Sequence, residues 1–301
     1  AFQFITDMNM ARKGQVYAYS PLPLTYSSGT FMTSHGAIVS TIGGAYTYTP
    51  TSSYTGSDSF SLQVTDTNGN KATIAINITV NPLPSGGPYS ISLPENSSYT
   101  SSVMATSVNP GSLSYIAGTY ATTHGTVVVT SGGGYTYTPL SNYVGTDSFT
   151  ITAQDSLGGQ NTITVNVTVT DIAPIPGATT SPTTYDPLYN VTNNAYQITV
   201  AKSVQYSGVV YAYSGSTVTY SLGTTSRNGT PTVSSDGTYT YLSSTVGTDN
   251  FTVTATDSYS VSSTINVNVS VVSNPVTGLL PYGNANAGAF GAADGTTLVF
   301  N

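Results

Sequence analysis

Two histidines are the side chains in this chain best suited to acid–base chemistry. His35 and His124 each precede a glycine, at equivalent places in a sequence that recurs along the chain, and the third copy has Asn228 there. Catalysis by histidine needs a nucleophile or second base in the same pocket. We interpret a residue that recurs with the repeat, and that asparagine replaces, as a turn residue. No catalytic residue is assigned, and the chain is predicted not to be an enzyme.

Aspartates recur in two sets. The first set stands two residues before a phenylalanine in each copy and comprises Asp58, Asp147 and Asp249. The second set follows at one fixed distance and comprises Asp66, Asp155 and Asp257. Short acidic side chains beside strands and in turns commonly accept hydrogen bonds from nearby backbone N–H groups. Both sets are therefore interpreted as structural.

Seven asparagines lie in N-x-S/T sequences that can accept a glycan: Asn77, Asn96, Asn166, Asn190, Asn228, Asn250 and Asn268. One such sequence is weak support in a chain rich in Asn and Thr. However, Asn77, Asn166 and Asn268 occupy equivalent places, where apolar neighbours on both sides direct them outward. Glycosylation and an ordinary polar outer face both remain open.

Paired tyrosines offer flat rings for stacking on sugars. Each copy contains a Tyr-Thr-Tyr sequence, which supplies Tyr46 and Tyr48, Tyr135 and Tyr137, and Tyr239 and Tyr241. Such pairs more often form a ladder that fills or flanks a core. The pattern therefore favours a structural role.

These residues recur because the chain repeats itself. "GGAYTYTPTSSYTGSDSF" at 43–60 returns as "GGGYTYTPLSNYVGTDSF" at 132–149 and "DGTYTYLSSTVGTDNF" at 236–251. Residues 1–20 also align without gaps to 195–214, and both end in "VYAYS". The repeats predict sandwiches over 1–84, 85–173 and 195–274. A Pro/Thr/Gly-rich linker covers 174–194, and a tail covers 275–301.

The hydrophobic period within a copy is two. Phe60, Leu62 and Val64 alternate with polar residues, and so do Ile74, Ile76, Ile78 and Val80 beyond the turn "DTNGN". Such alternation indicates strands with one buried face, and a pair around a Gly/Asn turn indicates a hairpin. Short strands with turns every 8–12 residues or so are typical of a β-sandwich. The fold class is therefore all-β, with three tandem sandwiches of the immunoglobulin type.

Composition excludes several functions. Five Lys and Arg residues cannot neutralise a nucleic-acid backbone, so no nucleic acid is expected as a partner. The chain has no cysteine, and no apolar run reaches the ~18 residues of a membrane span. Charged residues form only 6% of the chain, whereas Tyr, Thr, Ser and Asn are abundant. This balance favours an extracellular or cell-surface location.

The string "HGAIV…YTYTP…YTGSDSFSLQVTDTNG…INITVNPLP" resembles the cadherin-like, immunoglobulin-fold tandem repeats of bacterial and archaeal surface adhesins and filaments. The resemblance covers nearly the whole chain except the linker and the tail. It implies calcium between domains, because related cadherin repeats bind it with clustered carboxylates. Glu95, Asp155 and Asp171 are the calcium candidates that it offers. With twelve acidic residues in the chain, no metal site is assigned and no cofactor is required.

The tail is surplus to the three sandwiches. Its end, "TTLVFN", reads as a short strand placed where a fourth sandwich would begin. Thr297, Leu298, Val299 and Phe300 are therefore candidates for a strand that adds to a neighbouring subunit. A head-to-tail contact that does not close makes a filament. Truncation of a longer array is the other interpretation of the tail.

Together these patterns predict an extracellular structural protein. It would be the subunit of a surface filament or pilus-like fibre, with copies of itself as partners. The alternative is a tandem-repeat adhesin stalk or glycan-binding module, whose partners are other surface proteins or glycans.

Overall fold

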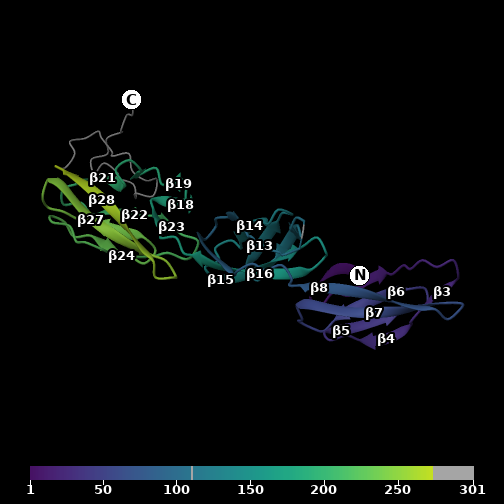
Figure 1. The fold of residues 1–301 in the computed structure, drawn as a ribbon. Coiled ribbons are helices and arrows are strands. Elements are labelled where there is room, and N and C mark those ends of the chain that lie inside the picture. The colour runs from purple at the N-terminus through teal and green to yellow at the C-terminus, as the bar shows by residue number, and fades with distance from the viewer. Residues whose placement is uncertain (110, 274–301) are drawn as a thin grey trace, which may run out of the picture. The chain divides into compact units, whose positions relative to one another are not determined.

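The computed structural model describes residues 1–109 and 111–273 (Figure 1). These residues form strands and turns without an α-helix, and none of their elements is an apolar helix long enough to cross a membrane. Contacts divide the chain into two compact units. Among the described residues, unit 1 comprises 1–93, 97–140 and 145–168, and unit 2 comprises 94–96, 141–144 and 169–273. Each unit is described by itself.

Sandwich 1 has two four-stranded sheets. One runs in the order β1 (Phe2–Asp7), β8 (Lys71–Asn81), β7 (Gly56–Asp66), β3 (Leu24–Tyr26). The other runs in the order β2 (Arg12–Gln15), β6 (Ala45–Pro50), β5 (Gly36–Ser40), β4 (Gly29–Met32). Both sheets contribute to one buried cluster, which includes Ile38 and Tyr48 from one sheet and Leu62 and Ile76 from the other.

Sandwich 2 repeats this arrangement. Its first sheet runs β9 (Tyr89–Pro94), β16 (Gln160–Thr170), β15 (Gly145–Gln154), β11 (Ser114–Tyr115). Its second runs β10 (Tyr99–Ser102), β14 (Gly134–Pro139), β13 (Gly125–Val129), β12 (Gly118–Ala121). The Phe149 ring of the first sheet lies 5.3 Å from Tyr135 and 5.8 Å from Tyr137 of the second, measured between ring centroids.

Sandwich 3 has a five-stranded and a three-stranded sheet. The larger runs β20 (Tyr189–Asn190), β21 (Ala195–Ala201), β28 (Ser262–Val272), β27 (Gly247–Thr256), β24 (Thr219–Leu222). The smaller runs β22 (Tyr206–Val209), β26 (Thr238–Tyr241), β25 (Thr232–Val233). Two further pairs join β17 (Ile175–Pro176) to β23 (Ala212–Tyr213) and β18 (Ala178–Ser181) to β19 (Thr184–Tyr185).

The long hairpin of sandwich 1 follows from the period-two pattern. Phe60 pairs with Ile76 and Leu62 with Ile74, so their side chains share one face of the sheet. Gly69 turns the chain at a φ of 82°, a conformation that side chains other than glycine rarely adopt. The predicted strands, the turn and the all-β class are confirmed.

The first strand of a sandwich pairs with the last strand in parallel. Phe2 lies opposite Ile76 in sandwich 1, and Tyr196 lies opposite Val267 in sandwich 3. In sandwich 2, β9 neighbours the last strand β16. Each sandwich therefore fills its first-strand position with its own chain.

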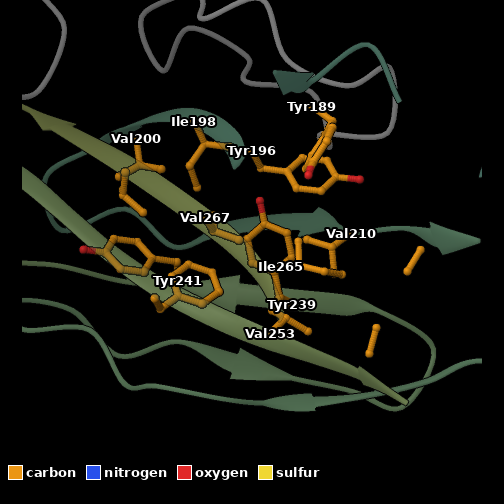
Figure 2. Packing of buried hydrophobic residues seen from close by; sticks show 14 of the residues in the cluster. Tyr189, Tyr196, Ile198, Val200, Val210, Tyr239, Tyr241, Val253, Ile265 and Val267 are labelled. Carbon is orange, nitrogen blue, oxygen red and sulfur yellow. The ribbon is translucent and has the colours of Figure 1, made fainter. Parts of the chain in front are cut away.

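The segment predicted as a linker is folded into sandwich 3. Tyr189 of β20 pairs with Tyr196 of β21, and the two rings meet edge to face at 5.2 Å. Figure 2 shows both tyrosines in the buried cluster with Tyr239 and Val210. Composition alone indicated a linker because Pro, Thr and Gly dominate it, but its few large apolar side chains bury themselves against the next sandwich.

Candidate functional site

A buried tyrosine–aspartate bond recurs in all three sandwiches. The second tyrosine of each Tyr-Thr-Tyr sequence donates its hydroxyl to the aspartate near the start of the long hairpin. The pairs are Tyr48 with Asp58 at 2.8 Å, Tyr137 with Asp147 at 2.9 Å, and Tyr241 with Asp249 at 2.7 Å. These tyrosine rings are fully buried, so they cannot stack on a sugar. Their predicted structural role is the one that the geometry supports.

Further donors hold the same carboxylates. Burial raises the pKa of Asp147, but hydrogen bonds from Thr122, Ser148, Tyr137 and His124 outweigh it and lower the pKa below the usual value. The pKa values of Asp58 and Asp249 are lowered for the same physical reasons. Ionised carboxylates of this kind fasten one sheet to the other.

The residue at the histidine position of each repeat makes hydrogen bonds through its backbone groups. The N–H of His124 donates to Asp147, and its carbonyl accepts from Leu140. Asn228 likewise donates its N–H to Asp249 and accepts from Ser243. The His35 ring stacks on Tyr54 at 4.0 Å, and its carbonyl accepts from Thr51. A backbone role explains why asparagine can replace histidine here.

The second set of aspartates opens the hairpin turns. In each copy one carboxylate oxygen accepts two backbone N–H groups at about 3 Å, from the residues two and four positions further on: Asn68 and Asn70 for Asp66, Leu157 and Gly159 for Asp155, and Tyr259 and Val261 for Asp257. The other oxygen distinguishes the copies. In Asp66 it accepts from the Asn70 side chain, and in Asp155 it accepts from the Asn109 side chain, which also binds Asp7. In Asp257 it has no donor among the described residues, and Asp171 is close by.

Unit 1 holds a buried pair of carboxylates around one amide. The Asn109 side chain donates to Asp7 at 2.5 Å and to Asp155 at 2.6 Å. Asp7 is fully buried, and no donor among the described residues reaches its Oδ2. Burial is the main cause that raises the pKa of Asp7; the Asn109 bond opposes it, and the charge of Asp155 adds to it.

Unit 2 holds three neighbouring acids. Burial, then Asp257, then Glu95 raise the pKa of Asp171 to about 6. No donor in the described part of the chain reaches either oxygen of Asp171 or Oδ2 of Asp257. Glu95 accepts from the Ile172 N–H at 3.4 Å. Repulsion between these carboxylates is therefore only partly relieved by the protein.

The calcium candidates are divided between the two units. Glu95 and Asp171 lie together with Asp257, while Asp155 lies with Asp7 and Asn109. Carboxylate oxygen is the donor that calcium prefers, but calcium takes about six to eight oxygens. Across residues 1–109 and 111–273, no group of three or more His, Cys, Asp or Glu side chains is arranged to hold a metal ion. The donor type fits calcium and the number of donors falls short.

Sequence reasoning missed Asp7, Asn109 and Asp257 as members of these clusters. One signal was available, since the first strand of sandwiches 1 and 2 ends at or just before an acid, Asp7 or Glu95. The signal for Asn109 was absent, because its loop has no repeat counterpart that carries an amide.

The glycan-acceptor asparagines lie on accessible surface. Asn268 is half-buried and the other six are exposed: Asn77, Asn96, Asn166, Asn190, Asn228 and Asn250. The predicted intersubunit strand, Thr297 to Phe300, lies outside the described residues.

Replacing Asp147 by Asn is expected to destabilise sandwich 2 by about 1.5–3 kcal/mol, the usual range for a hydrogen bond to a charged group. The substitution removes the charge that holds Tyr137 and Thr122. Urea unfolding followed by tyrosine fluorescence measures the change. Tyr17→Phe, on an exposed ring whose hydroxyl bonds to no described residue, serves as the control and should unfold like the parent. Equal stability of Asp147→Asn and the parent would show that the bond is dispensable.

The stability of unit 2 is expected to fall as pH rises from about 4 to about 7. Because the pKa of Asp171 is raised in the folded state, the folded chain binds more protons than the unfolded chain in this window. Asp171→Asn should flatten this slope and raise the unfolding temperature at pH 7.5 in metal-free buffer. Calorimetry at constant ionic strength measures both. Asp236→Asn, at an exposed turn whose aspartate has a lowered pKa, should keep the slope of stability against pH. Loss of the slope in this variant would contradict its assignment to Asp171.

Comparisons with known proteins agree with the fold. A family model described as a bacterial Ig domain matches residues 17–79 and 81–168. No curated protein matches the chain. Among solved structures, Drosophila N-cadherin EC1-4 is 15% identical, with a TM-score of 0.33 over 90% of this chain and 73% of that one. A titin I-band fragment, I67-I69, is 8% identical, with a TM-score of 0.43 over 90% of this chain and 96% of that one.

These structural likenesses are too distant to carry a functional argument. The family match covers half of the chain and falls on the strands that build the first two sandwiches. The chain belongs to the bacterial Ig domain family and consists of tandem immunoglobulin-like sandwiches.

Proposed function

We propose that this chain is an extracellular structural protein, the subunit of a cell-surface filament that assembles head to tail by β-strand addition. One observation carries the proposal: segments that follow one sandwich already add as strands to the next. After sandwich 1, Ser85 forms an antiparallel bridge with Thr106 of sandwich 2. After sandwich 2, β17 and β20 add to β23 and β21 of sandwich 3.

A strand from a neighbouring copy would add at an edge, not inside a sandwich. Each of the three sandwiches already has its own first strand beside its last. The sequence places the strand Thr297–Phe300 where a first strand would begin, but that position is filled in the acceptor. Edge addition uses the free N–H and C=O groups of an outer strand.

The apolar end of the tail is not sufficient for assembly. Burying Leu298, Val299 and Phe300 contributes roughly 1.5–3 kcal/mol for each side chain. Association costs on the order of 4–15 kcal/mol. Backbone hydrogen bonds and a second contact surface therefore have to supply the remainder.

The outer faces suit a protein surrounded by water and carrying few charges. Along β7 and β8 the exposed positions include Ser59, Ser61, Gln63, Asn77 and Thr79. Exposed acceptor asparagines on all three sandwiches would carry hydrophilic glycans in a secreted protein. This surface, the absence of cysteine and the family membership support an extracellular, non-enzymatic role.

The alternative is a glycan-binding or adhesin-stalk module. A groove of about 590 Å³ on sandwich 3 favours it, because amide and hydroxyl groups line the groove, among them Gln197, Asn250 and Thr248, together with Arg227. Asp249 also borders this groove, but its carboxylate is held by Tyr241 and two backbone N–H groups. None of the described residues that line the groove is aromatic, so they offer no stacking surface of the kind that many sugar sites use.

Native full-length protein is expected to form fibres with a regular repeat in negative-stain electron microscopy. Removal of residues 296–301 should abolish them and leave the unfolding temperature unchanged, because those residues follow the three repeats in the sequence. Single rods from the native protein would favour the stalk. Fibres that persist after the removal would show that the terminal strand does not join subunits.

Calcium binding at the two carboxylate clusters is a second proposal; because the described side chains supply fewer oxygens than calcium takes, water would have to complete its coordination. A cation would relieve the repulsion between Asp7 and Asp155, and between Asp171, Asp257 and Glu95. Ligand that binds only the folded state stabilises it, by about 2.7 kcal/mol at a hundred times Kd.

Adding calcium to chelator-treated protein is therefore expected to raise the unfolding temperature, as measured by calorimetry. Asp155→Asn and Asp257→Asn should each weaken the response. Asp66→Asn is the matched control, because Asp66 opens the equivalent turn but is only half-buried and is held by Asn70. An unfolding temperature indifferent to calcium would exclude the sites.

A further inference from the structure

Sandwich 1 carries the same docking surface that the linker covers on sandwich 3. The surface has two parts. The first is the outer edge of the first strand, and the second is the "VYAYS" segment, residues 16–20 in sandwich 1 and 210–214 in sandwich 3. Since the two sequences align without gaps, the two surfaces can be compared residue by residue.

The backbone of this segment is held in the same way in every sandwich. The N–H of Ala18 donates to the Tyr26 hydroxyl at 2.9 Å. The N–H of Ala212 donates to Tyr220 at 2.8 Å, and that of Ala105 in sandwich 2 donates to Tyr115 at 2.9 Å. The three segments are therefore structurally equivalent, and what covers one can cover another.

In sandwiches 2 and 3, a segment from earlier in the chain pairs with the residue that follows this alanine. Thr106 and Ser85 exchange two backbone hydrogen bonds, at 2.8 and 2.9 Å. Tyr213 pairs with Ile175 in the same antiparallel sense. The corresponding Tyr19 of sandwich 1 is 95% exposed and makes no hydrogen bond to any described residue.

The strand edge shows the same contrast. In sandwich 3, β20 lies outside β21, and Tyr196 is 1% exposed. Its counterpart Phe2 in β1 is 39% exposed, although Phe2 pairs with the last strand in the same register. Ile5 of β1 is 38% exposed. Among the described residues, nothing pairs outside β1.

The spacing of the chain identifies a segment that fits. Ser85 lies four residues after the end of β8, and Ile175 lies five residues after the end of β16. Four and five residues after the end of β28, at Val272, stand Val276 and Thr277, in the first part of the tail. The tail is 27 residues long from 275 to 301, enough to continue to the first-strand edge as the linker does.

We propose that the tail of one copy docks on sandwich 1 of the next. Thr277 pairs antiparallel with Tyr19, in the register of Ile175 with Tyr213, and Thr297–Phe300 adds outside β1, as β20 lies outside β21. The inference rests on the proposed filament and names its acceptor. The junction between two copies then repeats the junction within the chain.

Cysteine pairs test this contact in the full chain, which has no cysteine of its own. Residues opposite each other in an antiparallel pair lie about 4.5–5.5 Å apart at Cα, within the range of a disulfide. Tyr19→Cys with Thr277→Cys should give, under mild oxidation, a ladder of dimers and larger species on a non-reducing gel. Reductant should collapse the ladder.

Two matched pairs accompany it. Ser85→Cys with Thr106→Cys should close within one molecule, because these residues already form a bridge, and it shows that oxidation works. Val39→Cys with Thr277→Cys places one cysteine on a 54% exposed residue of the other sheet and should give no ladder.

The possible outcomes separate the docking site from the filament itself. Fibres in the microscope together with a Tyr19–Thr277 ladder support both. Fibres without this ladder overturn the docking site and leave the filament standing. A disulfide confined to monomers shows that the tail returns to its own sandwich 1 and overturns the inference. Native protein without fibres, whatever the gel shows, refutes the proposed function.

Discussion

The parallel pairing of first and last strands is the constraint on which the rest of this structure depends. In sandwich 1 it joins Phe2–Asp7 to the strand that ends at Asn81, so the first and last strands of one repeat lie side by side. The chain therefore leaves each sandwich next to its own first strand. A following segment meets a filled position and has to add at an outer edge or at the "VYAYS" segment. The observed bridges at Thr106 and Tyr213 follow this rule.

Charge in this protein is sparse, and its placement has two opposite effects. Asp58, Asp147 and Asp249 are surrounded by donors, so folding lowers their pKa values and favours the ionised form. Asp7, which accepts from Asn109, and Asp171 are buried beside other acids, so folding raises their pKa values. The first group holds the two sheets of each sandwich together. The second group stores repulsion that protonation or a cation relieves.

Most of the fold could be predicted from the sequence, because alternation and turn chemistry are local signals. The hairpin around Gly69 and the buried face with Leu62 and Ile76 were readable directly. The role of residues 175–190 was not, because Tyr185, Leu188 and Tyr189 are too few and too irregularly spaced to show a period. The partners of the carboxylates were equally hidden, since Asp7 meets Asn109 and Asp155 across long stretches of sequence.

The position of Tyr189 in the core of sandwich 3 also bears on how such a chain could have multiplied. The repeat visible in the sequence begins at Ala195, but Tyr189, whose ring packs against Tyr196, lies ahead of it. A duplication that copied only the visible repeat would create a sandwich whose first strand exposes the aromatic ring equivalent to Tyr196. A sandwich therefore has to be copied together with the segment ahead of it. Only then can an array lengthen without exposing new apolar surface.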